Sequence, residues 1–482
     1  MPVMNPSTGA KIAEAPCCTM EEVNAAVASA KKAYPGWANT PVPKRTQLMF
    51  RFKQILDEHL EELTLLLSTE MGKVLDEARG DVLKAIEVVE CACSTPYLMQ
   101  GDTCMNVSEG YDTVSYREPL GVFVGIVPFN FPAMIPFGWV IPFAITTGNT
   151  VVLKAASMVP QTAIRLLELL QQAGLPKGVV NVVTCSRTEA EQLIVHPDVR
   201  GISFVGSTSV GVHIYTTAAA HGKRVQALTE AKNHALVLHD CILDRTVRSI
   251  INSTYGCAGQ RCMALPVVCV EEEIADEFTA LLTKYAQELR IGPAYLPESQ
   301  LGPVVSAGQK KWIVDWIDRG AKEGAELVLD GRSASVPGFE GGYYVGPTIF
   351  DHVKPGMAIG EEEVFGPVTC IKRVKDFEDG VAIMNANPFG NGSSIHTTSG
   401  RSAREFVRRT AAGMVGVNVG IPVPFGIFPF SGHKRSFFGD LHTLGKDGVA
   451  FFTETKSVTS TWFSDAGTKD KLSTWDGTLT RS

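Results

Sequence analysis

The sequence predicts an α/β fold built on parallel sheets, and three observations support this. From Leu120 onward, short runs rich in β-branched residues alternate with helical patterns, as in βαβ units. A second block of the same kind starts at 266–271 and continues past Gly420. The chain has 482 residues, of which 45% are hydrophobic, so it can bury a large core and divide into more than one domain.

The N-terminal region is predicted to be helical. Thr19 and Glu22 form a capping box ahead of an apolar helical face, and we expect Pro35 to lie beyond the end of that helix. A second, longer helix is expected from Lys44 to about Met71, where apolar residues keep the 3.6 period. Both helices are expected to be scaffold.

The first alternating block predicts five strands and two helices. The strands are expected at 121–127, 150–153, 179–184, 202–205 and 235–239, and the helices near 160–173 and 188–195. Ligands of open α/β sheets bind beyond the carboxyl ends of the strands. The loops after Val127, Leu153 and Val205 are therefore the places where a site is expected.

The remaining segments complete the predicted organisation. The second block is expected to carry helices at 274–289 and 308–324, and the apolar, proline-containing stretch 129–145 to be buried backbone around a site. The segments 101–117 and 451–463 are expected to be strands outside both cores. Exposed strand edges tend to be paired, so a sheet shared between subunits is expected there. The segment 465–482 is expected to be a loose tail.

Composition excludes several classes of function. The net charge is −7 and no Lys/Arg run marks a basic arm, which argues against nucleic acid or an anionic membrane as a partner. The eleven cysteines are scattered, with no spacing typical of a metal site or a disulfide framework. No targeting segment and no membrane-spanning run is visible. We therefore expect an intracellular protein, mitochondrial or cytoplasmic, that acts on small molecules without a metal.

Cys262 is the first candidate for chemistry. The run 256–264 (GCAGQRCMA) places its thiol among small residues and beside Arg261. Glycines give backbone amides access to a reacting carbonyl, and a neighbouring cation favours the thiolate. The alternative is that Cys262 is one more buried structural cysteine.

Asn130 is the second candidate. The run 128–132 (PFNFP) directly follows a predicted strand and holds one amide between two aromatic rings and two prolines. A side-chain NH₂ fixed in a dry pocket suits the oxyanion that forms when a thiolate attacks an aldehyde. The alternative is an ordinary turn that contains an asparagine.

Together with further motifs, these residues make the chain resemble the aldehyde dehydrogenase superfamily over nearly its whole length. The matching runs are 128–132, 148–154 (GNTVVLK), 174–183, 204–211 (FVGSTSVG), 259–262 (GQRC), 363–367 (EVFGP) and 429–432 (PFSG). The resemblance implies a Rossmann-like dinucleotide-binding domain, expected at 1–100 and 118–231, and an α/β catalytic domain, expected at 232–431. It also implies a small oligomerisation sheet from 101–117 and 451–463, and assembly into homodimers or homotetramers.

The resemblance also implies roles for individual residues. Cys262 matches the nucleophile and Asn130 the oxyanion donor. Lys154 matches a contact to the adenosine ribose and Glu363 a contact to the nicotinamide ribose, while Gly206 and Ser207 begin a helix that faces the pyrophosphate. The residues expected to bind the cofactor, NAD, are Phe129, Lys154, Ser157, Gly206, Ser207, Glu363 and Phe365. Ser157 stands where related enzymes usually have a glutamate. Without that carboxylate, the 2′-phosphate of NADP is not repelled, so NADP is a second expected cofactor.

Within the superfamily, the chain is most similar to the methylmalonate-semialdehyde dehydrogenases. The runs that carry this similarity are 260–264 (QRCMA), 232–234 (KNH) and 435–440 (RSFFGD). The similarity implies an acyl enzyme that loses CO₂ and passes to coenzyme A as co-substrate. Leu228 lies where hydrolytic relatives carry a glutamate base, and an aliphatic side chain cannot take a proton. Glu230, two residues along, remains a candidate substitute.

A carboxylate on the substrate would need cations, and the sequence offers two. Arg261 can grip a carboxylate bidentately, and Lys84 stands where the subfamily is expected to carry an arginine. The alternatives are a structural ion pair for Arg261 and a solvated helix face for Lys84. Two other functions stay open: a hydrolytic NAD(P)-dependent dehydrogenase for another aldehyde, with Glu230 as base, and a catalytically retired binding protein.

Overall fold

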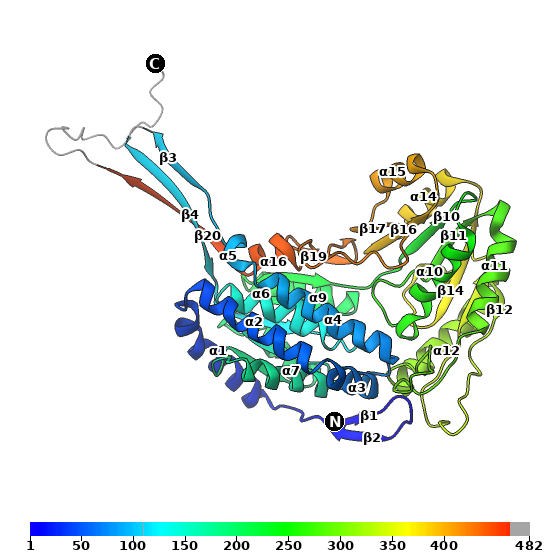
Figure 1. The fold of residues 1–482 in the computed structure, drawn as a ribbon, viewed down its shortest axis with the longest axis horizontal. Helices are drawn as coiled ribbons and strands as arrows, with labels where there is room; N and C mark the ends of the chain where they lie inside the picture. Colours follow the sequence, from blue (N-terminus) through cyan, green and yellow to red (C-terminus); the bar gives the residue numbers. More distant parts are fainter. Residues whose placement is uncertain (109, 463–482) are drawn as a thin grey trace, which may run out of the picture.

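Two parallel sheets and a projecting three-stranded sheet organise the protein (Figure 1). The computed structural model describes residues 1–108 and 110–462. The predicted α/β class is confirmed. The division into domains at the boundaries expected from the sequence remains a prediction.

The first sheet has six strands in the order β19-β9-β8-β5-β6-β7, with β19 antiparallel to β9 and the others parallel. Its strands are β5 (Val122–Ile126), β6 (Thr150–Lys154), β7 (Val180–Val183), β8 (Val199–Val205), β9 (Arg224–Leu228) and β19 (Phe437–Gly439). Val122 and Val124 face one layer of helices while Phe123 faces the other. This period of two is what a sheet covered on both sides requires.

Helices cover both faces of this sheet. One face packs against α1 (Met20–Ala38), α8 (Arg187–Val195) and α9 (Thr208–Ala220). The other packs against α2 (Val42–Glu58), α3 (Leu60–Met71), α4 (Leu75–Ala92), the π-helix η1 (Ile135–Val140), α6 (Ile141–Thr146) and α7 (Pro160–Gln172). Of the stretch 129–145, which the sequence predicts to be buried, residues 132–145 are buried, whereas Phe129 and Phe131 are half-buried.

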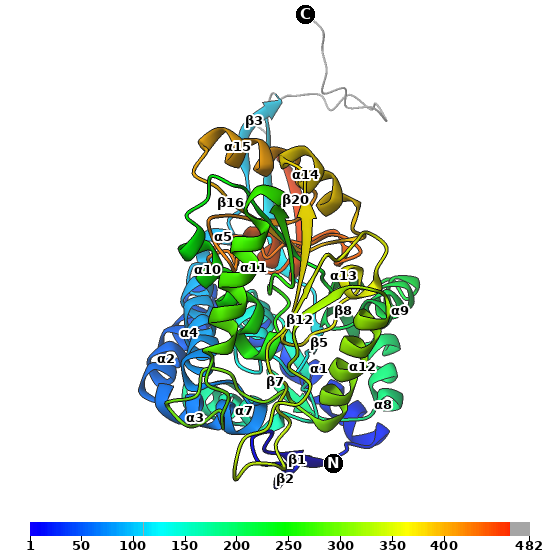
Figure 2. The ribbon, with the colours of Figure 1, turned by 90° about the vertical axis from the view of Figure 1, so that its right-hand side faces the viewer.

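The second sheet has seven strands in the order β12-β13-β14-β11-β10-β16-β17, of which only β12 runs antiparallel to its neighbour. Its strands are β10 (His234–Val237), β11 (Val267–Glu271), β12 (Glu326–Leu329), β13 (Thr348–Asp351), β14 (Val368–Val374), β16 (Gly392–His396) and β17 (Met414–Val417). One face packs against α10 (Leu243–Tyr255), α11 (Glu272–Gln287), α12 (Ala307–Lys322) and α13 (Ala358–Glu361), the other against α14 (Phe377–Ala386) and α15 (Gly400–Arg409). Figure 2 views this half of the molecule, with α11 and α12 in front of the strands.

The third sheet projects from the body as an arm made of β3 (Thr103–Ser108), β4 (Tyr111–Pro119) and β20 (Thr453–Thr461) (Figure 1). β4 and β20 pair antiparallel along their whole length, and most side chains of β3 and β20 are exposed. Its expected use in joining subunits stays a prediction, and the expected tail at 465–482 lies outside the described residues.

Short elements complete the chain. They are β1 (Pro2–Met4), β2 (Lys11–Glu14), α5 (Thr95–Leu98), the 3₁₀ turn η2 (Gly256–Gly259), β15 (Phe389–Gly390), β18 (His433–Lys434) and α16 (Gly445–Phe451). Within the described residues, no helix combines the length and the apolar character needed to cross a membrane.

The structure corrects four details of the predicted elements. Pro35 lies inside α1, one turn from its end, where its missing N–H costs a single helical bond and its carbonyl still accepts from Asn39. The helix expected over 44–71 is two helices that meet at His59. One helix was expected because the apolar period continues across this break. β9 was not predicted, and the strand expected at 235–239 belongs to the second sheet as β10.

A buried ion pair fixes the loop that follows β5. Lys73 Nζ lies 2.9 Å from the Asp81 carboxylate, and both side chains are fully buried. Asp81 also accepts the backbone N–H of Met134 at 2.8 Å, and Lys73 lies 3.4 Å from the centre of the Phe131 ring. The pair therefore ties α4 to the segment that carries Asn130.

We predict that Asp81→Asn destabilises the protein by about 3–5 kcal/mol, because the Lys73 ammonium would stay buried without a counter-charge. Urea unfolding followed by circular dichroism measures this. Asp315→Asn is the matched control, since it removes one partner of the exposed Lys311–Asp315 pair and should cost less than about 1 kcal/mol. Equal losses in the two variants would contradict this role of the pair.

Candidate active site

A left-handed turn at residues 257–259 precedes Cys262 and positions the loop that carries it. Cys257 and Ala258 both have φ of 52° and Gly259 has φ of 72°, so the chain reverses sharply after α10. A Cβ on Gly259 would lie 2.0 Å from the carbonyl oxygen of Gly366, which only glycine avoids. The turn therefore presses the nucleophile loop against the 363–367 segment.

Two asparagine side chains hold the backbone of Cys262. The Nδ2 atoms of Asn233 and Asn391 donate to the Cys262 carbonyl oxygen at 2.8 and 2.9 Å. Asn233 belongs to a sequence run that carried the subfamily resemblance, although no role was predicted for it. Asn391 was not singled out, because a lone asparagine before a strand gives no local signal.

Cys262 lies where two cavities meet. The first, of about 270 Å³, is lined by Phe129, Asn130, Gly206, Ser207, Glu363 and Phe365 together with Cys262. The second, of about 470 Å³, is largely apolar and is lined by Phe131, Met134, Phe430, Lys84 and Arg261 together with Cys262. Cys262 therefore borders two cavities, one lined by aromatic rings and a carboxyl group and the other largely apolar.

Asn130 lines the first cavity beside the thiol, as expected. Its Nδ2 donates one hydrogen bond, to the Gln260 carbonyl oxygen at 3.1 Å, and its side chain is buried. An amide NH₂ carries two hydrogens, so one donor remains for an oxygen formed next to Cys262. The Gln260 contact fixes the orientation of the amide in advance.

Burial keeps the Cys262 thiol protonated. Desolvation, followed by the negative charge of Glu363, raises the pKa of this thiol to about 12. Arg261 acts in the expected direction and lowers the pKa of the thiol, but burial and Glu363 outweigh it. Arg261 Nε donates to Cys257 Sγ at 3.1 Å and Nη2 pairs with Glu77 at 3.1 Å, so its charge is largely committed elsewhere.

The first cavity combines aromatic rings with a carboxyl group. Phe129 and Phe365 contact each other edge to face, with ring centres 5.9 Å apart, although they come from opposite halves of the chain. Glu363 accepts the backbone N–H of Ala231 at 3.1 Å. Burial, followed by the charge of Glu230, raises the pKa of the Glu363 carboxyl to about 8.

Lys154 and Ser157 lie farther along the first sheet. Lys154 ends β6, Ser157 follows in the next turn, and both side chains are half-buried. Neither lines the cavity that contains Cys262. Desolvation lowers the pKa of the Lys154 ammonium. The two residues remain candidates for the distant end of an extended ligand.

The start of α9 is partly occupied by the protein itself. The Gly206 N–H donates to the Leu228 carbonyl oxygen at 3.0 Å. The Thr208 N–H, the first of the helix, donates to the Glu230 carboxylate at 3.0 Å. Leu228 is buried in β9 and cannot take a proton, whereas Glu230 lines the first cavity with Cys262.

The structure brings both candidate cations to the second cavity, and both have other partners. Arg261 pairs with Glu77, as described above. Lys84 Nζ pairs with Glu87 at 2.6 Å, donates to the Pro424 carbonyl oxygen at 3.0 Å and lies 5.6 Å from the Phe425 ring centre.

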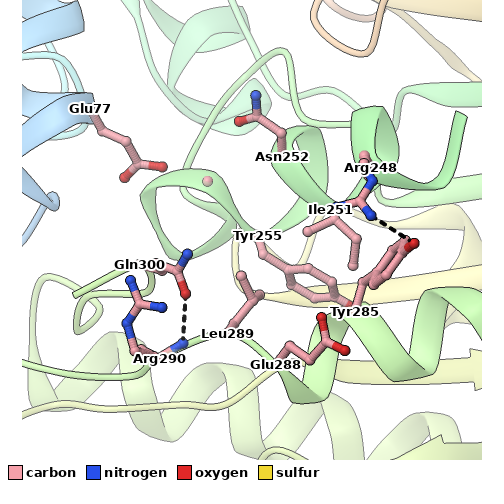
Figure 3. Close-up of a pocket in the computed structure, with 11 residues that line it drawn as sticks. Glu77, Arg248, Ile251, Asn252, Tyr255, Tyr285, Glu288, Leu289, Arg290 and Gln300 are labelled. Atoms are coloured by element: carbon pink, nitrogen blue, oxygen red, sulfur yellow. Dashed lines mark hydrogen bonds between the residues drawn. The ribbon is translucent and has the colours of Figure 1, made fainter. Parts of the chain in front are cut away.

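A third cavity, of about 480 Å³, lies beside the second and shares Glu77 and Asn252 with it. Figure 3 shows Glu77 on one side and Arg248, hydrogen-bonded to Tyr285, on the other. No residue expected to bind substrate or cofactor lines it. Across residues 1–108 and 110–462, no group of three or more His, Cys, Asp or Glu side chains could hold a metal ion.

Comparison with known proteins identifies the family. The model of the aldehyde dehydrogenase family matches residues 1–458. Malonate-semialdehyde dehydrogenase 1 of Oceanobacillus iheyensis is 46% identical over 96% of this chain and 94% of its own length. Malonate-semialdehyde dehydrogenase 2 of Geobacillus kaustophilus is 48% identical over 95% of each chain.

Solved structures agree. The methylmalonate-semialdehyde dehydrogenase DddC of Oceanimonas doudoroffii superposes with a TM-score of 0.95 at 41% identity, covering 96% of this chain and 95% of its own. A Sinorhizobium meliloti 1021 protein assigned to the same group, solved in complex with NAD, gives 0.95 at 40% identity, covering 96% and 94%. This chain therefore belongs to the aldehyde dehydrogenase family.

Proposed function

We propose that the protein oxidises malonate or methylmalonate semialdehyde with NAD and transfers the decarboxylated acyl group to coenzyme A. The observation that carries this proposal is the position of Cys262 between two unlike cavities. The apolar one is lined by Lys84 and Arg261 together with Asp76, Glu77 and Asp81. An aldehyde bearing a carboxylate would take one of the two cations from its present carboxylate partner, Glu87 or Glu77. The relatives with 45–48% identity named malonate-semialdehyde dehydrogenase support the same substrate class.

The first cavity suits the nicotinamide end of a dinucleotide. Phe129 and Phe365 offer aromatic surface to a flat ring, and Glu363 offers a carboxyl group to ribose hydroxyls. Lys154 and Ser157 would meet the adenosine end. When bound, NAD supplies the hydride acceptor, and Ser157 brings no negative charge that would repel the 2′-phosphate of NADP.

The residues around Cys262 fit covalent catalysis. The Cys262 thiol first gives its proton to a base in the first cavity, where Glu230 and Glu363 supply carboxyl groups. The resulting thiolate adds to the aldehyde carbon, and the oxygen that gains the electron pair lies next to the free Asn130 N–H and the Cys262 backbone N–H. Asn233 and Asn391 hold the Cys262 carbonyl, which keeps the neighbouring backbone in position. Loss of a hydride from the adduct leaves a thioester on Cys262.

The second half of the cycle follows from the thioester. The bond between the α-carbon and the carboxylate breaks, CO₂ leaves, and the electron pair passes into the thioester carbonyl before the α-carbon takes a proton. The coenzyme A thiolate then attacks this carbonyl and Cys262 leaves as thiolate. Malonate semialdehyde would give acetyl-CoA and methylmalonate semialdehyde would give propionyl-CoA.

The nature of the resolving nucleophile is directly testable. We predict that steady NADH formation from malonate semialdehyde requires coenzyme A, because Leu228 cannot act as a base for water, and that mass spectrometry identifies acetyl-CoA as the product. Cys262→Ala should lose activity by at least about 10³-fold, whereas Cys241→Ala, at a half-buried thiol that lines neither cavity, is the matched control. Full turnover without coenzyme A would instead support the hydrolytic alternative, with Glu230 as base.

The raised pKa of Cys262 predicts how the free protein reacts with iodoacetamide. Only the thiolate reacts, so alkylation at Cys262 should be slow at neutral pH and keep rising as the pH approaches 12. Peptide mass spectrometry measures it, with the exposed Cys104 of the same chain as internal reference. A plateau reached below about pH 8 would show that another group activates Cys262.

Lys84 offers a test of the substrate carboxylate. We predict that Lys84→Gln raises the KM for malonate semialdehyde by about 10-fold to 100-fold, the worth of a charge-assisted hydrogen bond, with little change for uncharged propanal. Lys84→Arg should retain a low KM. Lys53→Gln, on the neighbouring helix α2, is the control. Equal increases for both aldehydes would assign Lys84 a packing role.

A further inference from the structure

Glu230 occupies the start of α9 with a negative charge. Its Oε2 accepts the Thr208 N–H at 3.0 Å, where a 13-residue helix presents its free N–H groups and the positive end of its dipole. The side chain of the N-cap residue, Ser207, does not accept a hydrogen bond from the first turn of the helix. The Glu230 carboxylate is therefore the anion that satisfies this helix terminus.

The surroundings indicate that another ligand belongs at the same place. Glu230, Gly206 and Ser207 line the cavity that contains Cys262 and Glu363. The Thr208 hydroxyl is buried and, among the described residues, has no hydrogen-bond partner. A buried hydroxyl without a partner is costly. Thr208 does not itself line the cavity but adjoins Ser207, which does, so a phosphate at the start of α9 would lie next to this unsatisfied hydroxyl.

We propose that Glu230 competes with the phosphates of the dinucleotide for the N-terminus of α9, and so sets the affinity for the cofactor. This inference rests on the proposed use of NAD. A diphosphate and the carboxylate cannot share the Thr208 N–H, and they repel each other. Binding must therefore displace the Glu230 side chain or accept its repulsion.

The local structure lets the side chain move while the backbone stays. The Glu230 carbonyl accepts the Ser436 hydroxyl at 2.7 Å, and Ser436 in turn accepts the Gly390 N–H at 3.1 Å. The side chain itself is half-buried and faces the cavity. Among the described residues, the Glu230 carboxylate makes one hydrogen bond, to the Thr208 N–H, so rotation of the side chain breaks a single contact that a phosphate would replace.

The test compares binding of NAD, nicotinamide mononucleotide and nicotinamide riboside to the full-length protein by calorimetry. We expect Glu230→Gln to lower the Kd for NAD by about fivefold to tenfold, as removal of a nearby like charge predicts, with the gain shrinking at high salt. The gain should be smaller for the mononucleotide and absent for the riboside, which has no phosphate. Gln keeps an acceptor for Thr208, so folding is retained.

Two further variants sharpen the result. Glu230→Ala also frees the Thr208 N–H and should bind NAD at least as tightly as Glu230→Gln. Glu362→Gln removes an exposed carboxylate beside Glu363 and should leave the Kd unchanged. An unchanged or raised Kd for NAD in both Glu230 variants would overturn the inference, as would an equal gain for the riboside. Failure of the wild-type protein to bind NAD would instead overturn the proposed function.

Discussion

The close approach of Gly259 to Gly366 is the constraint on which the site depends. A backbone carbonyl 2.0 Å from where a side chain would begin allows no residue other than glycine at 259, directly after the left-handed residues Cys257 and Ala258. The contact joins the nucleophile loop to the segment carrying Glu363 and Phe365. One steric fact thus places the thiol, the carboxyl group and an aromatic ring around one cavity. The left-handed residues of the turn are strained, and the surrounding contacts that maintain them also fix the position of the nucleophile.

Polar contacts over long sequence distances complete this arrangement. The Cys262 carbonyl is held by Asn391, 129 residues away, and the Asn130 amide by Gln260, 130 residues away. The Asn130–Gln260 bond joins the loop after β5 of the first sheet to the nucleophile loop, and the Asn391–Cys262 bond joins two loops next to the second sheet. Because both asparagines donate to carbonyl oxygens, they fix backbone positions independently of the protonation of Cys262 or Glu363. Preorganisation of this kind is what a developing oxyanion needs.

Sequence reasoning found the residues whose neighbours along the chain are unusual, and missed those whose role arises from distant contacts. Cys262 and Asn130 stand in dense local motifs, and the β-rich run at 121–127 predicted the strand that the structure shows as β5. Asn391, Lys73 and Asp81 carry no such signal, because each matters through a partner on another element. The helix break at His59 was hidden for a related reason: the apolar face of α2 continues into α3. Arg261 shows that a neighbour in sequence need not be a partner in space. It precedes Cys262, but its guanidinium group contacts Cys257 and Glu77.

The electrostatics of the cofactor side follow from crowding acidic groups in a buried place. Glu363 is desolvated and feels Glu230, so its pKa rises to about 8, and its charge in turn raises the pKa of Cys262. Displacing the Glu230 carboxylate from α9 would change the pKa of the Glu363 carboxyl, since distance governs the repulsion between the two groups. The new position of the Glu230 carboxylate then affects the pKa of the groups that it approaches or leaves. Moved away from Glu363, it would lower the pKa of that carboxyl. Moved toward Cys262, it would oppose thiolate formation. Glu363 lies between Glu230 and Cys262 in this chain of influence, because its carboxyl responds to Glu230 and its charge raises the pKa of the thiol.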